Sequence, residues 1–276
     1  MKCGLVEKAH KVFEDLPIQD VVACNALMAG YAQCGLHDQV MSHFVWMREK
    51  GIDPDGATFT CILRTCASLG SLNIGEEIHT KICNRRLLEK DNVLGNTLVD
   101  MYSKCGMLEK ALRVFQELPE RDIIAWSTLV SGCAQMGHIE RILVLFGKMM
   151  AAGVAPNHVI FLGLLVACSH QGLVDEGQRI FNEMMGIYCV APSIQHYTCM
   201  VDLFSRAGHF SKAISLLEMV PASDRLAPLL SILGACQKWV NLAIGRWAFL
   251  QLQKLNEDCP TAYMCMGNIY AASDTS

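Results

Sequence analysis

The chain has 276 residues, of which 52% are apolar, and a formal net charge of −4 at pH 7. The apolar content is enough for a buried core and excludes a disordered chain. The slightly negative charge excludes the strongly basic surface typical of nucleic-acid-binding domains, so any binding of that kind depends on individually placed residues.

Glycines recur at intervals of 31, 35, 36, 31, 35 and 36 residues. Such a period indicates a repeat protein, whose units pack only against their neighbours. The alternating spacing predicts two-helix units of three different lengths. The phased glycines are Gly4, Gly35, Gly70, Gly106, Gly137, Gly172 and Gly208.

In chain order, the pattern predicts a partial unit over residues 1–20, six complete units, and a different region over residues 226–276. Lys2-Cys3-Gly4 matches Lys104-Cys105-Gly106, so we expect the sequence to be a fragment of a longer protein or a truncated gene prediction. The complete units are 21–55, 56–91, 92–122, 123–157, 158–193 and 194–225.

The unit 92–122 illustrates the expected anatomy of a repeat. Gly106 ends its first helix, because glycine accepts the left-handed conformation of a short turn. Pro119 closes the second helix, since proline cannot continue the hydrogen-bond ladder. The expected apolar faces consist of Leu94, Leu98, Val99 and Tyr102 in the first helix, and Leu108, Ala111, Leu112, Val114, Phe115 and Leu118 in the second.

Pro54, Pro156 and Pro192 end other units in the same way, and no segment reads as a strand. The predicted fold is all-α, a right-handed superhelical solenoid of helix–turn–helix repeats with the first helices on its concave side. Residues 226–259 read as one more helix pair, with Val240 where a turn glycine is expected. Residues 260–276 begin a further unit.

The 14 cysteines include no Cys-x-x-Cys pair, which argues against zinc and dithiol redox sites. Several recur at equivalent places in the repeat. Cys3, Cys34 and Cys105 precede a phased glycine, whereas Cys66, Cys168 and Cys236 lie in first helices. We expect small buried thiols that pack between helices, in a protein of a reducing compartment.

Several segments resemble successive motifs of the plant pentatricopeptide repeat (PPR) family, in the class with alternating medium, long and short units. They are NALMAGYAQCG, NTLVDMYSKCGMLEKALRVFQELPERD, FLGLLVACSHQGLVDEG and HYTCMVDLFSRAGHFSKA. The tail resembles a truncated E-type extension of editing factors, in SILGACQKWVNLAIG and AYMCMGNIYAAS. It departs from that pattern at Val240 and at Leu229, where the family usually has tryptophan.

The resemblance implies binding of single-stranded RNA, about one base per unit, with the fifth and last residues of a unit reading the base edge. It implies uracil or another pyrimidine for Asn25 with Asp55 and for Asn96 with Asp122, and adenine for Ser127 with Asn157. Thr60 with Asp91, Leu162 with Ser193, and Thr198 with Arg225 match no clear base.

The same residues also have structural interpretations. Asp55, Asp91 and Asp122 precede helices and can act as N-caps, with or without reading a base. The second residues of four units are β-branched. They are either core residues or, as the resemblance implies, wedges that pack between bases. They are Val22, Val93, Ile124 and Val159.

A basic residue lies two places before three of the glycines: Lys2, Lys104 and Arg206. A contact with RNA phosphate is one interpretation, and a favourable interaction with the helix dipole is the other.

No catalytic motif is complete. His138-Ile139-Glu140 matches the first half of a zinc cytidine deaminase motif, but the Pro-Cys-x-x-Cys half is absent. We therefore expect a non-catalytic chain without metal or cofactor. The longest strongly apolar stretch, Val159–Cys168, is about half a membrane span, so no membrane partner is expected.

Three hypotheses for function remain open at this point. The first is a specificity factor for C-to-U RNA editing in a mitochondrion or chloroplast, which recruits a separate DYW-type deaminase and other editing factors. The second is a factor for organellar RNA stabilisation, splicing or translation. The third is a protein-binding scaffold of tetratricopeptide type, although its uniform 34-residue period differs from this alternation.

Overall fold

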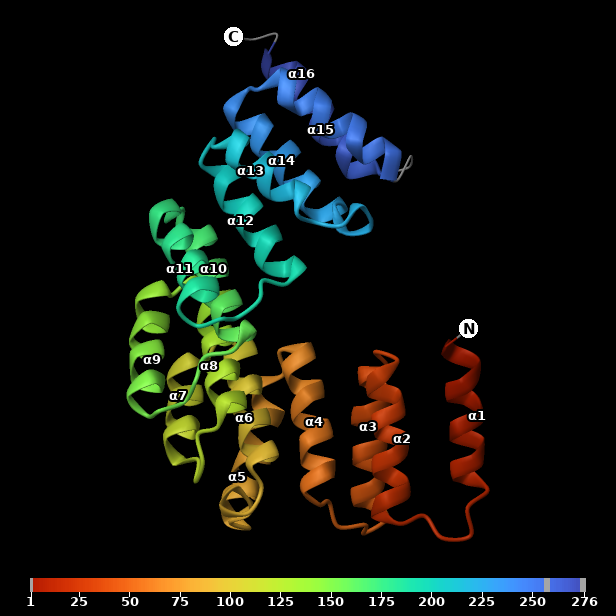
Figure 1. Cartoon of the computed structure of the whole chain (residues 1–276). Coiled ribbons are helices and arrows are strands. Elements are labelled where there is room, and N and C mark those ends of the chain that lie inside the picture. The colour runs from red at the N-terminus through yellow and green to blue at the C-terminus, as the bar shows by residue number, and fades with distance from the viewer. Residues whose placement is uncertain (1, 256–258, 274–276) are drawn as a thin grey trace. The chain divides into compact units, whose positions relative to one another are not determined.

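The structure is a computed structural model that describes residues 2–255 and 259–273, with side chains from residue 6 onward. Within these residues every regular element is a helix, as predicted. The chain divides into two compact units, residues 1–132 and 133–276, and the boundary falls within helix α8 (Ile123–Gln135) (Figure 1).

The first compact unit contains α1 (Lys2–Glu14), α2 (Val21–Gln33), α3 (His37–Glu49), α4 (Gly56–Leu69), α5 (Leu72–Asn84), the 3-10 helix η1 (Leu87–Glu89), α6 (Asn92–Lys104) and α7 (Leu108–Glu117). The second contains α9 (Ile139–Ala151), α10 (His158–Gln171), α11 (Val174–Gly186), α12 (Ile194–Arg206), α13 (Phe210–Glu218), the 3-10 helix η2 (Ala222–Asp224), α14 (Leu226–Trp239), α15 (Leu242–Leu255) and α16 (Pro260–Ser273).

Most of the phased glycines form the left-handed turns that the sequence predicts. Their φ angles lie between +66° and +80°. Gly4 is different, because it lies inside α1. The helix continues through Gly4, since a single glycine in a helix costs only about 1 kcal/mol. The left-handed turn glycines are Gly35, Gly70, Gly106, Gly137, Gly172 and Gly208.

The core lies between neighbouring helix pairs. In the first compact unit α4 packs against α2 and α6, and in the second α12 packs against α10 and α14. The predicted apolar face of α6 is buried at Leu94, Leu98, Val99 and Tyr102. Each fully buried side chain of this size contributes about 1.5–3 kcal/mol, so stacking on the next pair supplies most of the stability of each helix. In α7 the inward residues are buried except Leu112, which is half-buried.

The cysteines in the described part of the chain are free. Cys66, Cys168 and Cys236 are fully buried in first helices, and burial raises the pKa of each thiol to about 11. They are therefore neutral packing residues at physiological pH, as predicted. Cys34 and Cys105 are only half-buried, because they occupy the turns that follow α2 and α6.

His196 shows how a buried polar side chain holds a helix start. Its Nε2 lies 2.9 Å from the carbonyl of His158, so Nε2 carries the proton. Its Nδ1 then accepts from the backbone N–H of Ser193, at 3.1 Å, in a capping box. Burial lowers the pKa of His196, and it also lowers the pKa values of His43 and His79. All three rings are thus stabilised in the neutral form.

We predict that acid destabilises this fold through these histidines. Since their pKa values in the folded state lie below the unfolded value, the unfolded chain takes up protons first as the pH falls. The stability contributed by the neutral rings is fully present above about pH 6.5 and decreases as the pH falls below that value. Thermal melting followed by circular dichroism should show this decrease, and His196→Gln should reduce its slope. A melting temperature that is constant over this range would contradict the prediction.

Val240 adopts the turn conformation that glycine has in the other pairs. It ends α14 with φ +49° and ψ +42°, and its N–H donates to the carbonyl of Cys236. The turn is therefore kept despite the β-branched side chain, which costs roughly 1–2 kcal/mol in this left-handed region.

We predict that Val240→Gly raises the free energy of unfolding by about 1 kcal/mol, because it removes this strain. Gly172→Ala is the matched opposite change: Gly172 has φ +70°, and an added Cβ would meet no atom within 4 Å. It should lower the stability by about 1 kcal/mol through backbone strain alone. Chemical denaturation measures both. If Val240→Gly is destabilising, the side chain contributes packing that outweighs the strain.

Candidate nucleic-acid interface

Asn25 and Asp55, predicted to read one base together, are joined in the structure. Asn25 lies on α2, and Asp55 is the N-cap of α4. The Asn25 amide Nδ2 donates to Asp55 Oδ1 at 2.9 Å. The two interpretations of Asp55 are thus compatible, since the same carboxylate caps a helix and holds Asn25.

Thr58, which the sequence analysis did not single out, links these two residues. Its hydroxyl lies 2.7 Å from Asn25 Oδ1 and 2.9 Å from Asp55 Oδ1, and it accepts the Asp55 N–H at 3.2 Å. Its own N–H donates to Asp55 Oδ1 at 2.8 Å, which completes a capping box. In the usual capping box the third helical residue is Glu or Gln, and Thr58 fills this position here.

The Asp55 carboxylate is held in its ionised form. Burial on its own would raise the pKa of Asp55, but hydrogen bonds from the Thr58 N–H, the Asn25 amide and the Thr58 hydroxyl lower it overall. Asp55 Oδ1 takes these bonds, and the residue remains exposed. An exposed anionic acceptor therefore lies next to the amide of Asn25.

The equivalent pair, Asn96 and Asp122, is arranged differently. Asp122 accepts the N–H of Ala125 at 2.8 Å and so caps α8. Asn96 is buried on α6, and its Oδ1 has no hydrogen-bond partner among the described residues. The position of Thr58 is taken here by Ala125, which has no hydroxyl to link an asparagine to the capping aspartate.

The remaining predicted base-reading residues bond to local backbone. The Ser127 hydroxyl donates to the carbonyl of Ile123 at 2.6 Å, and the Thr198 hydroxyl donates to that of Ile194 at 2.9 Å. Asn157 is the N-cap of α10 and accepts two backbone N–H groups. Ser127 lies in the first compact unit and Asn157 in the second.

The β-branched second residues are mostly exposed. Val22 is 68% exposed, and Val93 and Ile124 are each 59% exposed. A core role is therefore wrong for these three side chains. Val159 is half-buried and can contribute to packing. Units 21–55, 92–122 and 123–157 thus each begin with an exposed apolar side chain that is available to contact a ligand.

Two of the three predicted phosphate-binding residues have an acidic neighbour one helical turn earlier. Lys104 Nζ lies 2.8 Å from Asp100, and Arg206 Nε lies 2.8 Å from Asp202. Both are in the last turn of their helices, where the helix dipole also favours a cation. Their positive charge is thus partly compensated within the protein. The side chain of Lys2 lies outside the described residues.

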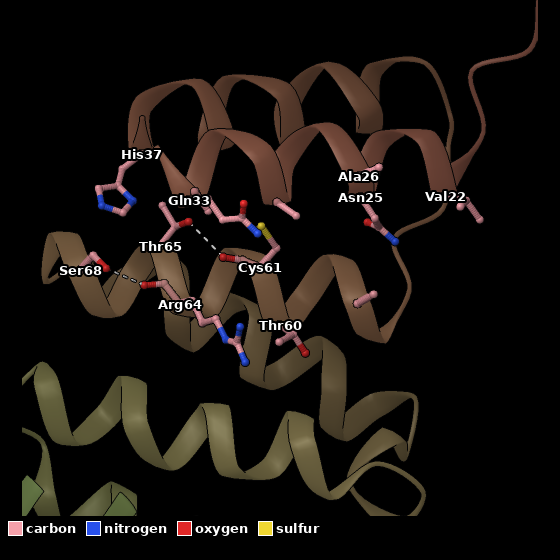
Figure 2. Close-up of a pocket in the computed structure, with 13 residues that line it drawn as sticks. Val22, Asn25, Ala26, Gln33, His37, Thr60, Cys61, Arg64, Thr65 and Ser68 are labelled. Atoms are coloured by element: carbon pink, nitrogen blue, oxygen red, sulfur yellow. Dashed lines mark hydrogen bonds between the residues drawn. The ribbon is translucent and has the colours of Figure 1, made fainter. Parts of the chain in front are cut away.

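A groove of about 640 Å³ runs between α2 and α4. Figure 2 shows Val22, Asn25 and Thr60 towards one end of it and His37 and Ser68 towards the other. Its lining contains no carboxylate, and the α2 side is formed largely by alanines. The groove thus begins beside Asn25, which is hydrogen-bonded to Asp55, and continues along both first helices.

This repeated helix pair can now be compared with known proteins. The PPR repeat family matches residues 19–68, and the PPR repeat matches residues 96–123, 124–154, 159–189 and 195–223. These matches cover more than half of the chain. The chain belongs to the pentatricopeptide repeat family.

Two PPR-containing proteins of Arabidopsis thaliana illustrate the similarity. One, named mitochondrial, is 37% identical over 99% of this chain and 43% of its own length. The other, named chloroplastic, is 35% identical over 99% of this chain and 37% of its own length. The chain thus spans less than half the length of either relative.

The fold agrees with a solved PPR structure. The pentatricopeptide repeat protein PPR10, crystallised with an 18-nt psaJ RNA element, matches with a TM-score of 0.77 at 18% identity. The match covers 98% of this chain and 41% of PPR10. At this identity it shows the fold alone, and it confirms the predicted all-α solenoid of helix–turn–helix repeats.

The expectation of a non-catalytic repeat protein agrees with membership of the PPR family. His138, the start of the incomplete deaminase motif, is an exposed residue at the start of α9. No group of three His, Cys, Asp or Glu side chains within the described ranges is arranged to hold a metal ion. Of the helices described, none has the length and apolar character needed to cross a membrane.

Proposed function

We propose that this PPR chain binds single-stranded RNA along its first helices and acts as a specificity factor for C-to-U editing in a mitochondrion or chloroplast. Residues 21–225 form the RNA-reading array in this proposal, divided into the six units that the sequence predicts. Residues 226–276 form an E-type extension that recruits a separate DYW-type cytidine deaminase and other editing factors.

The observation that carries RNA binding is the Asn25–Asp55 pair beside the exposed Val22. The Asn25 amide has a second N–H to donate, and the ionised Asp55 can accept. The Watson–Crick edge of uracil offers an N–H donor between two carbonyl acceptors, which is complementary to one donor beside one acceptor. In this proposal the exposed side chain of Val22 packs against the face of such a base.

The other registers extend this proposal. Asn96 with Asp122 is proposed to read a pyrimidine, Ser127 with Asn157 an adenine, and Thr198 a base that its unit does not specify. The exposure of Val93 and Ile124 supports a role in packing between bases. Lys104 and Arg206 already pair with Asp100 and Asp202, so they are proposed as secondary phosphate contacts. Lys2 is proposed as a further phosphate contact.

The comparisons support an RNA ligand and an organelle. PPR10 was crystallised with an RNA element, and two relatives are named mitochondrial and chloroplastic. Editing is favoured over stabilisation, splicing or translation by the alternating unit lengths and by the resemblance of the tail to E-type extensions.

We predict that Asp55→Ala weakens binding to an oligouridine RNA by roughly tenfold, which corresponds to one lost base contact of about 1–3 kcal/mol. Fluorescence anisotropy measures this affinity. Asp53→Ala is the matched control. It removes the same charge two residues before Asp55, and the carboxylate that it removes pairs with Arg85. Circular dichroism should confirm that both variants are folded.

The two variants separate base recognition from overall charge. Binding equal to the wild type in Asp55→Ala would contradict the base-reading role of this pair. An equal loss in both variants would show that only the net charge matters.

The editing role has its own test. We predict that loss of the gene leaves a particular organellar cytidine unedited, because no other array then selects that site. Sequencing of organellar transcripts from the mutant measures this. Complete editing at every cytidine, together with altered transcript ends or retained introns, would contradict the editing role and favour a factor for stabilisation or splicing.

A further inference from the structure

Cations are rare on the first helices of the first compact unit. Helix α2 and residues 123–132 of α8 contain no lysine or arginine, α6 ends in Lys104, and α4 contains Arg64. Lys104 is paired with Asp100. Arg64 is exposed and has no carboxylate within ion-pair distance among the described side chains. It is therefore the uncompensated positive charge on these helices.

The neighbours of Arg64 explain why its charge is uncompensated. The residues one helical turn before and after it on α4 are Thr60 and Ser68, and both are uncharged. The Ser68 hydroxyl donates to the carbonyl of Arg64 at 3.0 Å and not to an acid. Arg64 is the ninth residue of unit 56–91. The ninth residue of the short units 92–122 and 194–225 is an acid, Asp100 or Asp202, so the charge at this position has the opposite sign in unit 56–91.

Arg64 also lies in the groove between α2 and α4. Figure 2 shows it between Thr60, near the Asn25 end, and Ser68, near the other end. It is four residues beyond Thr60, which corresponds to about 6 Å along the helix axis. No carboxylate contributes to the lining, so no lining residue competes with an anion for Arg64.

We propose that Arg64 binds a phosphate of the RNA backbone where the strand passes the α2–α4 groove. This inference rests on the proposed function and adds a contact to it. A planar guanidinium donates two parallel hydrogen bonds to phosphate oxygens, and the absence of a competing carboxylate leaves these donors free for the ligand. Arg64 thus positions the backbone next to the base that Asn25 and Asp55 face.

Removal of a phosphate contact has a characteristic effect on salt dependence. For single strands, the plot of log affinity against log salt has a slope of about −0.7 for each phosphate neutralised. Arg64→Ala should therefore make the slope shallower by about 0.7 and weaken binding roughly three- to tenfold at low salt. The loss should be similar for oligouridine and oligoadenosine RNA, because a phosphate contact carries no sequence information. Arg64→Lys should retain most of the slope.

Arg113→Ala is the matched control, since Arg113 is an exposed arginine on the second helix α7. It removes the same charge and should leave the slope unchanged. The experiment uses the full chain, with circular dichroism of each variant.

An unchanged slope and affinity in Arg64→Ala would overturn this inference while the proposed function stands. An equal effect in Arg113→Ala would overturn it too, since the cause would be net charge. A loss confined to one RNA sequence would overturn it in favour of a contact with a base edge. If the wild-type chain binds neither RNA, the proposed function itself fails.

Discussion

A single helix hairpin of this chain cannot bury its apolar surface, and this constraint governs the rest of the structure. Helix α4, for example, is covered by its own second helix α5 and by α6, the first helix of the next pair. The tight left-handed turns, such as those at Gly70 and Gly106, keep the two helices of each pair antiparallel. Where Val240 replaces glycine, the turn is kept at the expense of backbone strain. Stacking is therefore strong enough to impose the turn on an unfavourable residue.

The same stacking brings two of the proposed base-reading residues, Asn25 and Asp55, together from consecutive pairs. The last residue of one unit is the N-cap of the next first helix, as Asp55 is for α4. The N-cap must face the helix start, and Asn25 on the previous first helix packs beside it. The hydrogen bonds that stabilise α4 thus also orient the groups offered to a base. The fold and the proposed RNA site share these bonds, so a change at Thr58 affects both.

Much of this could be predicted from the sequence, because turns and caps are local. The phased glycines, the capping aspartates and the apolar face of α6 depend on residues only a few positions apart. The E-type tail and the unit boundaries remain predictions. The exposure of Val22 excludes the core role that the sequence left open, and it could not be predicted because burial depends on neighbouring units.

Other features depend on how helices pack, and they were not predicted. The link through Thr58 joins α2 to α4, whereas Asn96 Oδ1 has no hydrogen-bond partner within the described part of the chain. The ion pairs of Lys104 and Arg206 were also not predicted. Each joins two residues four positions apart on one helix, so these pairs could have been found from the sequence. Arg64 could not, because its importance comes from a groove formed by two helices more than 30 residues apart.

Selection of RNA ligands from a random pool with the full chain tests the central claim most directly. If first helices and the following N-caps read consecutive bases, the bound RNAs share one pattern. Units 21–55 and 92–122 each select a pyrimidine, unit 56–91 between them is permissive, and unit 123–157 selects adenine. The account therefore predicts enrichment of pyrimidine, any base, pyrimidine and adenine at adjacent positions. Enrichment of a different spacing, or no enrichment over the starting pool, would contradict it.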